Sequence, residues 1–129
     1  MIRGKFLGER QDTPVIKVAI SNDLIIRTLV VILDTGFTSD LKIPPEIADE
    51  LGLEEVTFTA VRIADNRKVH VPVSVALCAM EGIFKDVEII ISEGPPAAGI
   101  GFLSKFSYKA ILDCKNKTVI LETVLTMPS

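Results

Sequence analysis

Residues 28–39 read TLVVILDTGFTS, and this stretch decides how the rest of the chain is interpreted. Its first six residues are apolar or β-branched, which is typical of a buried strand. Asp34 follows directly, so its carboxylate is predicted to emerge where a buried strand breaks into a turn. A buried acid needs hydrogen-bond partners. The hydroxyl of Thr35 and the unhindered backbone N–H of Gly36 are the candidates to supply them.

The string Asp-Thr-Gly by itself also fits a simpler role, in which Asp34 only hydrogen-bonds its own turn. By average residue usage it arises by chance in roughly one chain in forty of this length. The residues around it therefore carry more weight than the string alone.

Runs of β-branched residues on both sides of Asp34 predict a mainly β protein. Two pairs of runs form hairpins, one around the turn Ser21–Asp23 and one around the polar tip Ala64–Arg67. The predicted strands span 15–20, 24–33, 57–63, 68–77, 83–91, 109–112 and 118–122. Seven or eight short strands at close spacing favour a compact, closed β-barrel.

Only two segments are predicted to be helical. Residues 44–52 begin with two prolines and end with Gly52, as a short capped helix should. Residues 102–106 form a second candidate of one or two turns after Gly99 and Gly101. An apolar strand thus runs into a glycine turn and a short helix twice, but only the first copy carries a carboxylate.

Composition excludes several classes of function. The 129 residues are 48% hydrophobic, enough for a single domain over 1–129, and a net charge of -3 without a basic stripe argues against nucleic acid as a partner. No apolar run is long enough for a signal peptide or a membrane span, so a cytoplasmic protein is expected. A lone histidine, His70, excludes the usual zinc sites, and Cys78 and Cys114 are predicted to be buried, reduced thiols.

The order of these features resembles the retroviral-type (retropepsin-like, clan AA) single-domain aspartic peptidases. The resemblance covers nearly the whole chain. In chain order it is carried by the apolar strand with Asp34-Thr35-Gly36, Leu41 to Pro44, the short helix ending at Leu51-Gly52-Leu53, the hairpin tip at 64–66, Gly99 to Leu103, and the closing hairpin from Ala110 to Leu121.

The resemblance implies an acid-protease-type β-barrel that is functional as a homodimer, because each chain has a single Asp-Thr-Gly. By similarity Asp34 is the catalytic residue, Thr35 hydrogen-bonds across the dimer axis, and Gly36 completes the triad. Ala64, Asp65, Asn66 and Arg67 would form the flap over a peptide substrate in extended conformation. No metal and no cofactor are expected, because two aspartates sharing a proton can activate a water by themselves.

Three residues depart from the pattern of the family. Phe37 follows the triad where many relatives have Ala or Ser, Asn66 lies at a flap position often held by glycine, and Gly101 replaces a polar residue. A catalytically silent dimerisation or peptide-binding module is therefore an alternative to the enzyme. A third hypothesis is a plain structural β-barrel in which Asp34 caps a turn.

Overall fold

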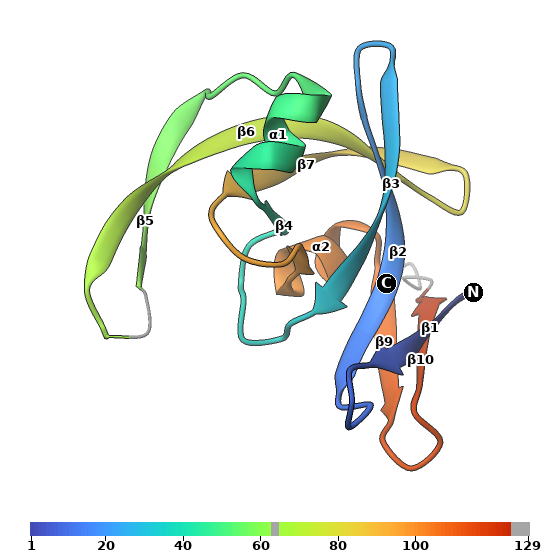
Figure 1. Ribbon diagram of the computed structural model, residues 1–129. Coiled ribbons are helices and arrows are strands. Elements are labelled where there is room, and N and C mark those ends of the chain that lie inside the picture. The colour runs from blue at the N-terminus through green and yellow to red at the C-terminus, as the bar shows by residue number, and fades with distance from the viewer. Residues whose placement is uncertain (63–64, 125–129) are drawn as a thin grey trace, which may run out of the picture.

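The computed structural model of the protein describes residues 1–62 and 65–124. In this part of the chain there are ten strands and two short helices (Figure 1), so the predicted mainly β class and the two helices are confirmed. The elements are β1 (Ile2–Leu7), β2 (Thr13–Asn22), β3 (Ile25–Leu33), β4 (Leu41–Ile43), α1 (Pro45–Leu51), β5 (Thr57–Arg62), β6 (Lys68–Met80), β7 (Ile83–Ile91), β8 (Ala97–Ala98), α2 (Ile100–Lys105), β9 (Tyr108–Asp113) and β10 (Thr118–Thr123).

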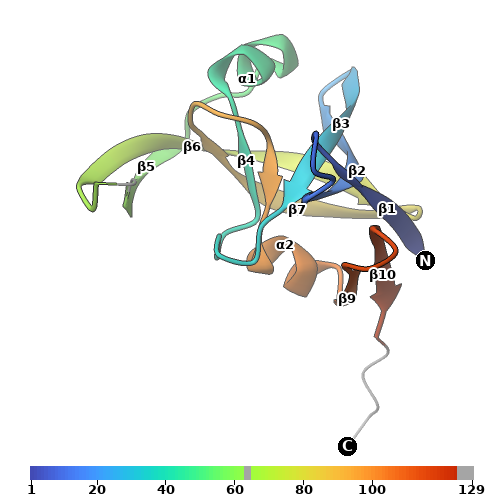
Figure 2. The same cartoon turned by 60° about the horizontal axis from the view of Figure 1, so that its bottom comes forward.

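The strands belong to one sheet with the order β5-β6-β7-β4-β8-β3-β2-β1-β10-β9. β6 also pairs with β2, so the pairings that run from β6 through β7, β4, β8 and β3 to β2 return to β6. β5 and β9 lie at the two ends of the order. Figures 1 and 2 both show the β5–β6 hairpin on one side of the molecule and the β1, β9 and β10 strands on the other.

The long β2–β3 hairpin forms as the sequence predicts. Its strands pair in register from Val15↔Ile32 to Asn22↔Ile25, and alternate residues of β2, such as Val18 and Ile20, are fully buried. Asp23 takes a left-handed conformation in the turn (φ 52°), which aspartate tolerates better than most residues. This hairpin places the end of β3, and hence Asp34, at a fixed point of the sheet.

Helix α1 begins and ends where its prolines and glycine predict. Pro45 occupies the first helical position after Pro44, where a missing N–H removes no helical hydrogen bond. Gly52 ends the helix in the left-handed conformation (φ 64°), and its N–H donates to the carbonyl oxygen of Asp49. Ala48 and Leu51 turn into the core.

The buried apolar side chains form two clusters. The larger one contains residues from β2, β3, β4, β6, β7, α1, α2 and β10. The smaller one consists of Val71, Val73 and Ile90, with Val69 and Phe37 packed against it. Since Val71 and Val73 belong to β6, this second cluster lies at the base of the β5–β6 hairpin, and Phe37 brings the loop after Asp34 into contact with it.

Three strands were not expected from the sequence. β1 pairs with both β2 and β10. It lies so close to β2 that a Cβ at Gly4 would overlap the carbonyl oxygen of Val15, so this position requires glycine. β4 and β8 are only three and two residues long and pair with strands distant in sequence. Such short strands have no periodicity of their own to detect.

The two cysteines are both free thiols, but only Cys78 is buried. The prediction of a buried Cys114 is wrong, because this residue lies exposed in the turn between β9 and β10. The described helices, α1 and α2, have seven and six residues, too few for either to cross a membrane.

Candidate active site around Asp34

Asp34 follows the last residue of β3, and its backbone is held by the β8 segment. The N–H of Asp34 donates to the carbonyl oxygen of Ala98 (2.9 Å), and the N–H of Ile32 donates to that of Pro96 (2.8 Å). β3 and β8 run parallel here, with Ile32↔Ala97 and Leu33↔Ala98 as partners. The main chain of Asp34 is therefore fixed although its side chain points out of the core.

The Asp-Thr-Gly turn orients the carboxylate of Asp34 locally. The N–H of Gly36 donates to Oδ1 of Asp34 (2.9 Å), and the N–H of Phe37 donates to the backbone carbonyl oxygen of Asp34 (3.1 Å). The predicted partner Gly36 is thus confirmed, whereas the hydroxyl of Thr35 makes no hydrogen bond to any residue that the structure describes.

The expectation that Asp34 is buried is wrong for the single chain. Asp34, Thr35 and Gly36 are all exposed. No residue in the described part of the chain donates to Oδ2 of Asp34. A carboxylate in this state can accept a proton or a hydrogen bond from a molecule outside the chain.

The loop 37–40 lies directly against the start of α2. The N–H of Ile100 donates to the carbonyl oxygen of Phe37 (2.8 Å), and that of Gly99 donates to the carbonyl oxygen of Asp40 (3.0 Å). Gly99 has no room for a side chain, because a Cβ would overlap the carbonyl oxygen of Phe37. The segment with Gly99 and Gly101, the second of the two predicted glycine turns, therefore packs beside the Asp-Thr-Gly turn.

One charged residue near the turn was missed by sequence reasoning. Asp40 is only 6% exposed, and its Oδ2 accepts from Nζ of Lys105 (2.6 Å) and from the N–H of Glu88 (2.8 Å). Next to it the hydroxyl of Ser39 donates to Oε1 of Glu88 (2.8 Å). Asp40 and Lys105 are far apart in sequence, and no local pattern signals such a pair.

The predicted flap residues lie at the end of the β5–β6 hairpin. Asp65 accepts from the backbone N–H and from Nε of Arg67, and Asn66 is left-handed (φ 68°), a conformation that glycine would also adopt. Ala64 lies outside the described residues. Figure 1 shows the hairpin reaching toward the same end of the molecule as the loop that carries Asp34.

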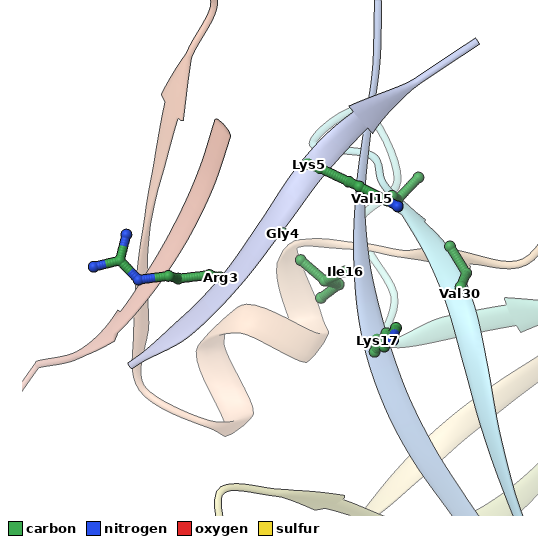
Figure 3. A pocket seen from close by; sticks show the side chains of 7 residues that line it. All are labelled: Arg3, Gly4, Lys5, Val15, Ile16, Lys17 and Val30. Carbon is green, nitrogen blue, oxygen red and sulfur yellow. The ribbon is translucent and has the colours of Figure 1, made fainter. Parts of the chain in front are cut away.

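A surface hollow of about 300 Å³ lies elsewhere, where β1 crosses β2 and β3 (Figure 3). Besides Arg3, whose side chain points away from the others in Figure 3, its lining residues are Gly4, Lys5, Val15, Ile16, Lys17 and Val30. None of the predicted site residues lines this hollow. The candidate site is thus identified by the Asp34 carboxylate and its turn, and this hollow is not part of it.

Comparison with solved structures supports the fold predicted from the sequence. A retropepsin-like aspartic protease from Rickettsia conorii is similar over 95% of this chain and 89% of its own (TM-score 0.72, 18% identity). The EIAV protease in complex with an inhibitor is similar over 82% of this chain and 99% of its own (TM-score 0.63, 15% identity). No family model matches the sequence, and no curated protein is significantly similar to it. The chain therefore has a retropepsin-like fold.

Proposed function

We propose that residues 1–129 form one aspartic endopeptidase domain, active as a homodimer in which Asp34 meets Asp34 of the partner subunit. The observation that carries this proposal is the exposed carboxylate of Asp34, held by a hydrogen bond from the N–H of Gly36 in a retropepsin-like fold. The second strand-to-turn segment, at β8, lies beside the first and has no carboxylate. One chain therefore supplies a single catalytic acid, and a second copy supplies the other.

Two aspartates a few ångströms apart cannot both ionise cheaply, so the pair shares one proton, as is known for the dyad of aspartic proteases. The ionised Asp34 takes a proton from a water whose oxygen attacks the peptide carbonyl carbon. The protonated Asp34 donates its proton to the carbonyl oxygen, and a tetrahedral diol forms.

The diol then loses a proton to one carboxylate while the leaving nitrogen gains one from the other. The C–N bond breaks, giving a carboxylic acid and an amine, and the pair is left with its single shared proton. The backbone N–H of Gly36 keeps its hydrogen bond to Oδ1 of Asp34 throughout the reaction. Thr35, with no partner among the described residues, is free to hydrogen-bond across the dimer axis.

An extended peptide is the substrate that fits this surface. β5 is an end strand of the sheet order and can pair its free edge with a peptide main chain. Phe37 and Val69, the half-buried side chains that pack on the small apolar cluster, offer apolar surface for side chains of the peptide. The residues Asp65, Asn66 and Arg67 would cover the bound chain. The free thiols suit a reducing compartment, and we propose the cytoplasm.

The test is cleavage of a mixed peptide library by wild type, Asp34→Asn and the control Asp23→Asn, an exposed turn aspartate. Products are identified by mass spectrometry between about pH 3.5 and pH 7, the span over which a carboxylate pair changes state. We expect wild type and Asp23→Asn to cleave, Asp34→Asn to be inactive though folded, and specific activity to rise with protein concentration. Cleavage by Asp34→Asn would refute the assigned mechanism.

A peptide-binding module without turnover is the second candidate, and Phe37 favours it. A serine at this position could donate to the outer oxygen of Asp34, whereas the Phe37 side chain packs against the small cluster instead. Tight binding of library peptides by a folded dimer, with no hydrolysis at any pH tested, would support this candidate.

A further inference from the structure

Asp40 is a buried charge next to the candidate site that the reaction itself does not use. Among the described residues only Asp40 and Ser74 are buried polar side chains. Burying a carboxylate is unfavourable unless it is paired and hydrogen-bonded. Lys105 and the N–H of Glu88 satisfy both conditions at 2.6 and 2.8 Å, so α2, β7 and the loop after Asp34 meet at this one group.

The carboxylate of Asp40 occupies the space that a side chain at position 101 would fill. A Cβ on Gly101 would overlap Oδ1 of Asp40. Gly101 is not among the residues with positive φ, so its backbone conformation does not require glycine. A Cβ there would also lie 2.9 Å from the carbonyl carbon of Ser39, so the backbone of the loop as well as the carboxylate requires a small residue at position 101. The family pattern has a polar side chain at position 101. In this protein the carboxylate of Asp40 occupies that space instead.

A chain of backbone hydrogen bonds connects Asp40 to the Asp34 turn. The carbonyl oxygen of Asp40 accepts from Gly99 N–H at 3.0 Å, and that of Phe37 accepts from Ile100 N–H at 2.8 Å. The N–H of Phe37 in turn donates to the carbonyl oxygen of Asp34 at 3.1 Å. The main chain at Asp40 and the turn that orients the catalytic carboxylate are therefore tied to the same two neighbouring residues, Gly99 and Ile100.

We propose that Asp40 is a positioning residue of the active site, and that its carboxylate does from the loop what a carboxylate at position 101 would do from the helix. The inference rests on the proposed function of Asp34. A residue that only stabilised the fold would not affect turnover. In the proposed role, the orientation of Asp34, and hence turnover, depends on the Asp40–Lys105 pair.

Moving the carboxylate from one position to the other tests the inference. The variants are Asp40→Ser, Gly101→Asp and the double variant, with Asp49→Ser as the control at an exposed acid of α1. Asp40→Ser should lower kcat by about 10²-fold, the effect of a misplacement of about 1 Å, with KM nearly unchanged. Gly101→Asp alone should be unstable, because it adds a second carboxylate in the same space. The double variant removes the overlap with Oδ1 but keeps the close approach to the backbone of Ser39, so it should regain only part of the stability and of kcat relative to Asp40→Ser and Gly101→Asp.

Hydrogen exchange gives a readout that does not depend on activity. In Asp40→Ser the amides of Phe37 and Ile100 should exchange faster than in wild type, and in the double variant their rates should move back toward the wild-type values. Wild-type kcat in a folded, dimeric Asp40→Ser protein, or unchanged exchange of these two amides, would overturn the inference. If wild type cleaves no peptide, the proposed function fails, and the exchange data alone decide whether Asp40 holds the turn.

Discussion

Gly99 and Phe37 lie so close that a single added carbon cannot fit between them. A Cβ on Gly99 would overlap the carbonyl oxygen of Phe37 and would lie 2.5 Å from that of Ser39. These carbonyl groups belong to the loop that follows the Asp-Thr-Gly turn, and they accept hydrogen bonds from the start of α2. The glycine thus sets how closely the helix approaches the candidate site.

Gly99→Ala should therefore destabilise the protein, although its φ of -108° is acceptable for alanine. Since backbone atoms would have to move, we expect a loss of about 3 kcal/mol, at the upper end for overpacking. Chemical denaturation checks this, with the exposed Ser104→Ala of α2 as control. A Gly99→Ala protein as stable as wild type would show that the loop relaxes freely.

Phe37→Ser should move the acidic limb of the pH–activity profile to lower pH. A serine hydroxyl beside the turn can donate to the outer oxygen of ionised Asp34, and a hydrogen bond to the charged form lowers a carboxyl pKa. Asp34, the proposed general base, would then stay ionised in more acidic solution. The matched control is Phe37→Ala, which removes the same ring without adding a hydroxyl. Equal shifts in both variants would assign the effect to lost packing.

Asp113 should stabilise the β9–β10 turn in a pH-dependent manner. The backbone N–H of Asn116 (2.9 Å), its side-chain amide (2.8 Å) and the N–H of Lys115 (3.1 Å) donate to the carboxylate and lower its pKa. Because the pKa is lower in the folded state, the stabilisation is complete above the unfolded value of about 3.9. It is lost as the pH falls through the folded value.

Thermal unfolding of Asp113→Asn and wild type from about pH 7 to pH 2 tests this dependence across the ordinary carboxyl pKa range. The variant should melt lower at neutral pH and approach wild type at the acidic end. Asp23→Asn, in the exposed β2–β3 turn, serves as the control. A difference that stays constant at all pH values would contradict the role of the charge.

The two thiols should differ sharply in reactivity. Burial, and after it the negative charge of Asp40, raises the pKa of Cys78 to about 12, whereas Cys114 is exposed. Since the thiolate is the reactive form, we expect one thiol per chain to react with a disulfide reagent at pH 8 and the second only after unfolding. Cys114→Ser should remove the fast reaction. Two fast thiols in the folded protein would contradict this assignment.

The sequence predicted the parts of the fold that local patterns determine. The β2–β3 and β5–β6 hairpins have alternating or β-branched strands around polar turns, and α1 has proline and glycine at its ends, so each carries its own signal. β4 and β8 have no such signal, because three and two residues show no period and are strands only through distant partners.

The same limit applied to the candidate site. Asp34, Thr35 and Gly36 are consecutive, so their turn could be read from the sequence, including the bond from Gly36. Asp40 depends on Lys105 and on the absence of a side chain at Gly101, and both lie in α2. The expected burial of Asp34 was wrong because its apolar strand ends one residue before it.

The parallel pairing of β3 with β8 also orders events in time. The acceptors for the N–H groups of Ile32 and Asp34 are the carbonyl oxygens of Pro96 and Ala98. During synthesis the Asp-Thr-Gly turn leaves the ribosome long before these residues exist. The nascent chain therefore carries its carboxylate at a strand end that is paired with β2 alone, and the turn reaches its final geometry only after residues 96–98 have been added.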